Sequence, residues 1–279
     1  MIKKALLIGI NYVDTPYQLN GCINDVKNVK TFLTDNCKFS ASNIKLLSDE
    51  ESQKPTRLNM ENGIMWLVND TLPGDILVLH YSGHGGNDID RTRDETDGMD
   101  ETLLPLDFET AGEIKDDWLF ENLVSKVPKD VTLWCFLDSC HSGTAVDLKH
   151  NYQSNCKYRR GIIPENLIYR KEEWTDNFTY SFEKTKEIIG TVCLFSGCQD
   201  RETSADAFIN STGQGAFTYC LLETLKNNLQ ENTLRYKNGT IKLRSVLKEI
   251  NCRLDCKGFT QNTQISLSRK ENFDLTLNL

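Results

Sequence analysis

Residues 131–143 read VTLWCFLDSCHSG and have the pattern of a buried strand that ends abruptly at a cysteine. Bulky apolar residues continue to Leu137, and the small and polar residues that follow are typical of a turn that exposes the Cys140 thiol. Residues 75–86, DILVLHYSGHGG, have the same design, with glycines on both sides of His84. Parallel neighbouring strands end at the same edge of a sheet, so we expect these two strands to bring His84 close to Cys140.

An imidazole beside a thiol predicts a cysteine nucleophile. A free thiol with a pKa of about 8.5 is mostly protonated at neutral pH, so a nearby base must take or share its proton. The glycines beside His84 let the chain turn sharply and expose N–H groups that could hold an oxyanion. Each motif alone has an ordinary explanation, because a His-Gly pair is usually a turn and a buried cysteine is usually a small core residue. Their joint appearance at two strand ends favours catalysis.

The runs HYSGHGG at 80–86 and DSCHSGTAVDL at 138–148 resemble the metacaspases, the caspase-like cysteine proteases of plants, fungi, protists and bacteria. The resemblance extends to residues 7–25, 97–108 and 195–207. It implies an α/β fold, a caspase-like three-layer sandwich with a mostly parallel central sheet and helices on both faces. Animal caspases match less well because their nucleophile signature is absent. Legumains, gingipains and separases are rival caspase-fold proteases, which the DGMDE and DD motifs disfavour.

The order of strand and helix patterns supports the same fold class. Apolar runs predict strands at 4–10, 43–47, 75–81 and 131–138, and helical spacing predicts helices at 22–35 and 56–69. Such alternation is typical of a mostly parallel sheet covered on both faces. Further along, we expect a strand at 191–196, helices near 214–227 and 242–254, and a last strand around 263–267.

The 279 residues contain no flexible linker, so we predict one caspase-like peptidase domain over residues 1–279. Residues 1–148 form its large-subunit-like part with the histidine and the cysteine, and residues 191–279 form its small-subunit-like part. Residues 149–190 are charged, and we expect a long connecting loop there. The resemblance to metacaspases implies a site of cleavage in this loop.

Composition excludes several classes of partner. A net charge of −8 argues against nucleic acid and suits a basic substrate or a divalent cation. No apolar run approaches the ~20 residues of a membrane span, and the N-terminus does not resemble a signal peptide. We therefore predict a cytoplasmic protein with reduced cysteines. Cys252 and Cys256 are expected to pack in the core without forming a zinc site. The resemblance implies a monomer.

An acidic pocket is expected beside the nucleophile. Asp138 precedes Cys140 by two residues, so both side chains should point to the same side of the strand. Asp25 lies in the first turn of a predicted helix, where it could simply complement the helix dipole. The resemblance places Asp25, Ser82 and Asp138 in the substrate pocket. Carboxylates there would pair with arginine or lysine, and we predict cleavage after these residues.

The predicted reaction is hydrolysis of a peptide bond through an acyl-enzyme on Cys140, with His84 as the base. Backbone N–H groups of Gly85 and Cys140 are the candidates for holding the oxyanion. No third residue that orients His84 can be assigned from the sequence. The alternative is a non-proteolytic module that binds partner or aggregated proteins. The presence of both His84 and Cys140 argues against it, because a protein without catalytic activity is free to lose either residue.

Seven acidic residues lie between positions 88 and 101. Most such runs are solvated loops. Carboxylates from several loops at one sheet edge would nevertheless repel one another unless a hard cation joined them, and Ca²⁺ accepts irregular sets of oxygen ligands. The spacing does not match an EF-hand. The resemblance implies an activating, non-catalytic Ca²⁺ held by Asp100, Asp116, Asp117 and Asp147.

Overall fold

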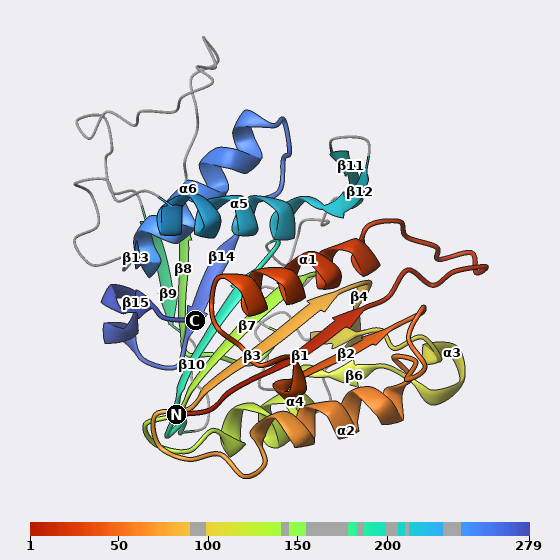
Figure 1. The fold of residues 1–279 in the computed structure, drawn as a ribbon, viewed down its shortest axis with the longest axis horizontal. Helices are drawn as coiled ribbons and strands as arrows, with labels where there is room; N and C mark the ends of the chain where they lie inside the picture. The colour runs from red at the N-terminus through yellow and green to blue at the C-terminus, as the bar shows by residue number, and fades with distance from the viewer. Residues whose placement is uncertain are drawn as a thin grey trace.

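A large central β-sheet lies between two layers of helices (Figure 1). The structure is a computed structural model that describes residues 1–89, 99–140, 145–154, 178–182, 187–198, 206–209, 212–230 and 241–279. The described strands of the sheet have the order β2-β1-β3-β7-β10-β14-β8-β9. In that order they span Ile44–Ser48, Lys3–Gly9, Ile76–Ser82, Thr132–Asp138, Thr191–Ser196, Gln264–Leu267, His150–Ser154 and Phe178–Phe182.

The strands from β2 to β10 are parallel to one another, whereas β14, β8 and β9 each run antiparallel to their neighbours. The helices are α1 Cys22–Asp35, α2 Arg57–Val68, α3 Phe108–Ala111, α4 Asp116–Asn122, α5 Ala216–Gln230 and α6 Leu243–Cys256, with short 3₁₀ turns at Ala41–Asn43, Val124–Lys126 and Lys270–Asp274. Helices α1, α5 and α6 cover one face of the sheet, and α2 and α4 cover the other (Figure 1). The predicted three-layer α/β fold is therefore confirmed.

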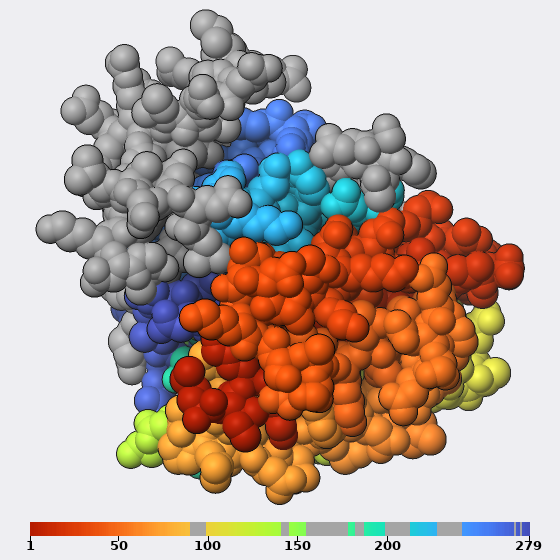
Figure 2. All heavy atoms as spheres, viewed as in Figure 1, coloured from red at the N-terminus to blue at the C-terminus, as the bar shows by residue number. Residues whose placement is uncertain are grey.

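Both faces of the parallel strands are buried, which explains why they read as continuous apolar runs. Successive side chains of a strand point to opposite faces. In β7, Trp134 and Phe136 join the core under α1, α5 and α6, whereas Leu133 and Cys135 join the core over α2 and α4. The same alternation places Asp138 on the α1 and α5 face. In the space-filling view, α1 and α5 lie against each other over this face (Figure 2).

The predicted strands and helices of the parallel half are present within about two residues of their expected ends. The segment 149–190 differs from the prediction, because β8 and β9 within it join the central sheet. Helix α4, which begins at Asp116, ends at Asn122, and a 3₁₀ turn follows over Val124–Lys126.

Small sheets lie beside the main one. β4 Gly85–Ile89, β5 Met99–Leu103 and β6 Ile114–Lys115 form one of them; β11 Asp206–Ile209 pairs with β12 Thr212–Gly215, and β13 Ile241–Lys242 pairs with β15 Thr276–Leu277. The first of these sheets begins directly after β3 and carries part of the acidic run, so this part of the run is not a solvated loop.

Candidate active site

The ends of β3 and β7 bring the segments of His84 and Cys140 together. These strands are parallel neighbours, with Ser82 opposite Asp138 in the register, and His84 and Cys140 each lie two residues further on. A Cβ atom on Gly85 would overlap the main-chain carbonyl oxygen of Cys140. Only glycine therefore allows this approach, and the expected meeting of the two strand ends at one edge is what the structure has.

Two buried tyrosines hold the main chain of His84. The His84 N–H donates to Tyr12 Oη at 3.1 Å, and the Tyr81 hydroxyl donates to the His84 carbonyl at 2.6 Å. Tyr12 in turn donates to the carbonyl of Leu104 at 2.6 Å. Burial raises the pKa of both tyrosines, so both hydroxyls keep their protons. A side chain on Gly83 would meet Tyr81 Oη at 2.7 Å, which explains the glycine before His84.

The imidazole of His84 is oriented by a main-chain carbonyl. Its Nε2 lies 2.7 Å from the carbonyl oxygen of Tyr17. A carbonyl only accepts hydrogen bonds, so Nε2 carries a proton, and in the neutral ring Nδ1 has the lone pair of a base. The ring of Tyr12 packs against the imidazole with centroids 4.8 Å apart. The sequence offered no orienting residue for His84, and no side-chain motif could have revealed this one, because the group is a peptide carbonyl.

Among the free cysteines, Cys140 differs from those in the core. It is partly exposed, whereas Cys37, Cys135, Cys193 and Cys220 are buried. Burial raises the pKa of the Cys37 thiol to about 11 and that of Cys220 to about 12. The pKa values of Cys135 and Cys193 are also raised by burial. These four thiols stay protonated at neutral pH and cannot serve as nucleophiles.

Cys252 does not follow the sequence prediction. It is buried on α6, as expected for a core residue, but it is disulfide-bonded. Cys256, one turn later, is free and partly exposed. The prediction of reduced cysteines is confirmed for other residues along the chain, which are all free: Cys22, Cys37, Cys135, Cys140, Cys193, Cys198 and Cys220. The disulfide of Cys252 was not predicted.

A cluster of buried carboxylates lies next to the two strand ends. Asp25 on α1 is fully buried and accepts a hydrogen bond from Ser82 Oγ at 2.7 Å. The N–H of Gly215 donates to both oxygens of Asp25 at 3.0 Å. Asp138, at the end of β7, accepts from the N–H of Thr218 at 2.9 Å and from its hydroxyl at 2.8 Å. Asp25 and Ser82 are therefore joined by a hydrogen bond, and Thr218 holds Asp138 separately.

The start of α5 holds both carboxylates. A Cβ on Gly215 would lie 2.7 Å from Asp25 Oδ2 and would overlap Asp138 Oδ2, so the two acids meet at this glycine. The first N–H groups of a helix have no partner within the helix, and the helix dipole favours negative charge there. Gly215 and Thr218 thus stabilise charges that burial alone would make costly. Neither residue could be identified from the sequence pattern, because one acts through its main chain and the other is an ordinary helical threonine.

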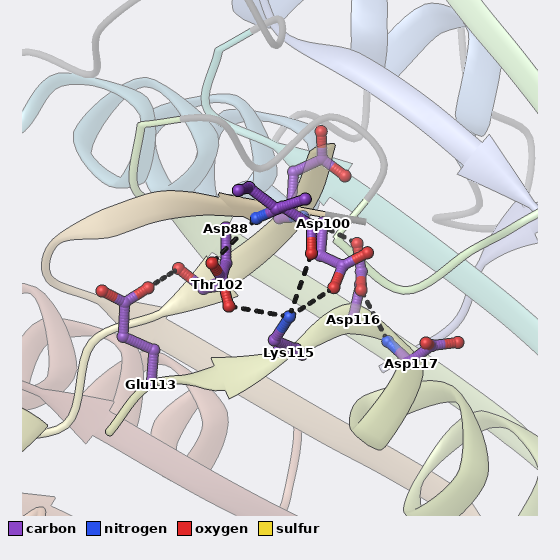
Figure 3. Close-up of polar contacts among 9 residues, drawn as sticks. Asp88, Asp100, Thr102, Glu113, Lys115, Asp116 and Asp117 are labelled. Atoms are coloured by element: carbon purple, nitrogen blue, oxygen red, sulfur yellow. Dashed lines mark hydrogen bonds and ion pairs between the residues drawn. The ribbon is translucent and has the colours of Figure 1, made fainter. Parts of the chain in front are cut away.

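Three of the four candidate calcium residues lie on β5 and at the start of α4 (Figure 3): Asp100, Asp116 and Asp117. The ammonium of Lys115 lies 2.6 Å from Asp100 Oδ2 and 2.8 Å from Asp88 Oδ2. Asp116 accepts hydrogen bonds from the N–H groups of Asp117 at 2.6 Å and Glu101 at 2.7 Å. Burial and the charge of Asp100 raise the pKa of Asp116 to about 6, although the two N–H donors act to lower it.

These residues fit a hard cation in chemistry, but their arrangement is incomplete. Their donors are carboxylate oxygens, which Ca²⁺ prefers, and the Lys115 ammonium shows that a positive charge is stable there. Within the described ranges, however, no three acidic, histidine or cysteine side chains are arranged to hold a metal ion. Asp100 lies close enough to Asp116 for its charge to raise the pKa of that carboxyl, and the joint role of the four residues in calcium binding stays a prediction. Asp147 has a left-handed backbone, with φ of 47°.

No helix in the described parts of the chain is long and apolar enough to cross a membrane.

Comparison with known proteins gives consistent results. Residues 3–149 match the sequence profile of the metacaspase, peptidase C14 domain. Metacaspase-1 of Meyerozyma guilliermondii is 33% identical over 98% of this chain and 71% of that protein. Metacaspase-1 of Coccidioides immitis is 36% identical over 85% of this chain and 57% of that protein, and metacaspase-1B of Aspergillus terreus is 33% identical over 98% and 77%.

A solved structure agrees along nearly the whole chain. The crystal structure of a Geobacter sulfurreducens protein, a structural genomics target, superposes with a TM-score of 0.65 at 26% identity. The match covers 98% of this chain and 97% of that one. The profile match includes both His84 and Cys140.

Proposed function

The chain belongs to the metacaspase family of C14 cysteine peptidases, and on this premise we propose that it is an endopeptidase that cleaves proteins after arginine or lysine. One observation supports this specificity above all: Asp25 and Asp138 are both buried and meet at Gly215, beside the two strand ends. Two buried carboxylates with fixed donors make an anionic pocket. A guanidinium or ammonium group is its natural partner, through charge-assisted hydrogen bonds.

The proposed mechanism uses the dyad of His84 and Cys140. With its Nε2 proton held by the Tyr17 carbonyl, His84 accepts the thiol proton of Cys140 at Nδ1. The thiolate attacks the peptide carbonyl, and the N–H groups of Gly85 and Cys140 hold the oxyanion. His84 then donates this proton to the leaving amine. The same imidazole takes a proton from the water that releases the acid product from the acyl-enzyme.

The two tyrosines keep the base in place during these steps. Tyr12 and Tyr81 together bind the N–H and the carbonyl of His84, and the position of its ring depends on both. A base must lie within hydrogen-bond distance of the proton that it removes, so a small shift of this segment would slow proton transfer.

We further propose that Ca²⁺ activates the protein. Asp100, Asp116, Asp117 and Asp147 would hold the ion, which when bound would neutralise the repulsion among these carboxylates. Lys115 has to release Asp100 before that oxygen can take part, so calcium binding is expected to change the contacts of Lys115. Calorimetric titration measures the binding directly, and Asp100→Asn should weaken it. Absence of calcium binding to the wild-type protein would refute this part of the proposal.

The central experiment is hydrolysis of matched fluorogenic peptides that end in arginine, lysine or aspartate. We expect cleavage of the first two only, and no turnover with Cys140→Ala. Asp138→Asn should lower kcat/KM for the arginine peptide about tenfold or more, because a charged partner is lost. Asp75→Asn is a matched control, since Asp75 is also buried but lies at the opposite end of β3.

Two results would count against the proposed function. Preference for the aspartate peptide would contradict the anionic pocket. Absence of any hydrolysis, with retained binding of the arginine peptide, would instead support a non-proteolytic protein-binding role. A monomeric state and a cytoplasmic location stay predictions, to be tested by light scattering and by fractionation.

A further inference from the structure

His80 is a buried histidine that the mechanism above does not use. It lies on β3 with none of its surface exposed, two residues before Ser82 and therefore on the same face. In the register of the sheet it stands beside Leu7 of β1 and Phe136 of β7, both members of the apolar core. A polar ring at such a place is costly unless it makes hydrogen bonds, so its contacts indicate its role.

The hydrogen bonds of His80 lead to the acidic pocket. Its Nε2 lies 3.1 Å from Thr218 Oγ1, which lies 2.8 Å from Asp138 Oδ2. A threonine hydroxyl has a single proton, and a carboxylate can only accept. The Thr218 proton therefore points to Asp138, and the hydroxyl oxygen accepts the Nε2–H of His80. This order assigns one tautomer to His80.

The other ring nitrogen of His80 is unsatisfied among the described residues. Nδ1 is buried and has no hydrogen-bond partner in the part of the chain that the structure describes. An unpaired buried acceptor destabilises a fold, and exceptions in native proteins often mark a function. Burial also lowers the pKa of His80 to about 3, so the ring is neutral at physiological pH. A leucine would fill the same core position without this penalty.

We propose that His80 is a positioning residue for substrate selection, which fixes the Thr218 hydroxyl so that Asp138 keeps one orientation in the basic-residue pocket. This inference rests on the proposed function, because it concerns how that pocket selects its substrate. Threonine hydroxyls in helices can instead bond to a main-chain carbonyl three or four residues earlier. The Nε2–H of His80 occupies a lone pair of the oxygen and directs its proton to Asp138. With both the hydroxyl and the N–H of Thr218 bound to Oδ2, the carboxylate cannot rotate freely.

The kinetic test compares paired substitutions. His80→Leu and Thr218→Val each break the hydrogen bonds that link His80 through Thr218 to Asp138. We expect kcat/KM for the arginine peptide to fall about tenfold, which is the typical loss of a hydrogen bond to a charged group. The loss should appear in KM, with kcat little changed. His80→Gln and Thr218→Ser keep a donor at the same place and should restore most of the affinity. The alkylation rate of Cys140 should be equal in all four variants, because His84 is untouched.

A spectroscopic test does not depend on activity. Nitrogen NMR of the wild-type protein labelled at histidine should show His80 with a protonated Nε2 and an unprotonated Nδ1, unchanged between pH 5 and 8. The spectrum of His80→Gln identifies the resonances. Titration of this ring near its usual pKa, or the opposite tautomer, would overturn the assignment even if the substituted proteins proved poorly folded.

The two proposals fail in different ways. A wild-type protein without preference for arginine or lysine would refute the proposed function, whatever the spectrum of His80 shows. A wild-type protein with that preference, whose KM is unchanged by both His80→Leu and Thr218→Val, would refute only the role of His80. An equal loss of kcat/KM in His80→Leu and His80→Gln would show that the ring only fills space and that its hydrogen bond to Thr218 does not orient Asp138.

Discussion

Replacement of His80 by glutamine should make the fold less sensitive to acid. The pKa of His80 is about 3 in the folded protein and about 6.5 for an ordinary histidine. Between these pH values the unfolded chain binds a proton that the folded protein does not bind. The contribution of His80 to stability is therefore complete above pH 6.5 and falls as the pH drops toward 3. Glutamine does not titrate, so His80→Gln lacks this loss.

The size of the effect follows from the linkage. Each pH unit below 6.5 lowers the free energy of unfolding of the wild type, relative to His80→Gln, by about 1.4 kcal/mol. At pH 5 the free energy of unfolding of His80→Gln, relative to that of the wild type, should therefore be about 2 kcal/mol higher than at pH 7.5. For a chain of this size such a change shifts the midpoint of thermal unfolding by roughly 3–4 °C.

The assay is urea unfolding of both proteins at several pH values from 7.5 to 5, followed by circular dichroism with a chelator present. Groups common to both proteins cancel in the difference. A difference that stays constant with pH would refute the reasoning. It would mean that His80 is readily protonated in the folded protein. Asp138, which lies on the other side of the Thr218 hydroxyl, would then stabilise the imidazolium.

Three other predictions concern the dyad. Gly85→Ala should lower kcat by about a hundredfold or more, because the new methyl group has to displace Cys140 by about 1 Å; near-normal turnover would show that the segments can move apart. Tyr12→Phe should lower kcat about tenfold with little change in KM, because the N–H of His84 loses its acceptor; a change confined to KM would contradict this. Iodoacetamide at neutral pH should modify Cys140 before Cys135 and Cys193, as read by mass spectrometry; equal labelling in the native state would oppose the proposed nucleophile.

The parallel half of the fold could be predicted because its signals are local. β3 and β7 are buried on both faces, and α1 has apolar residues at helical spacing, so the sequence pattern alone defines these elements. β8 and β9 could not be predicted in this way. Their sequences, HNYQS and FTYSF, contain few aliphatic residues, and pairing with β14 and with each other stabilises them. Such pairing depends on contacts distant in the sequence, which override local propensity.

The candidate site divides along similar lines. His84 and Cys140 could be identified because each ends an apolar strand in a recognisable motif. The groups that orient His84 and Asp25 could not, since the carbonyl of Tyr17 and the N–H of Gly215 belong to the main chain. Lys115 was missed for a different reason: a lysine beside an acidic run reads as one more exposed charge, whereas it bridges two aspartates.

The strand order of the central sheet interleaves distant parts of the chain. β10 and β14, from the last third of the sequence, stand between β7 and β8, which precede them. A single cut of the peptide chain between Ser154 and Phe178 would therefore yield two fragments that share one sheet. Strand β8 of the first fragment would lie between β14 and β9 of the second. The cleaved protein would therefore elute as a single species in size-exclusion chromatography, and its fragments would separate only in denaturant.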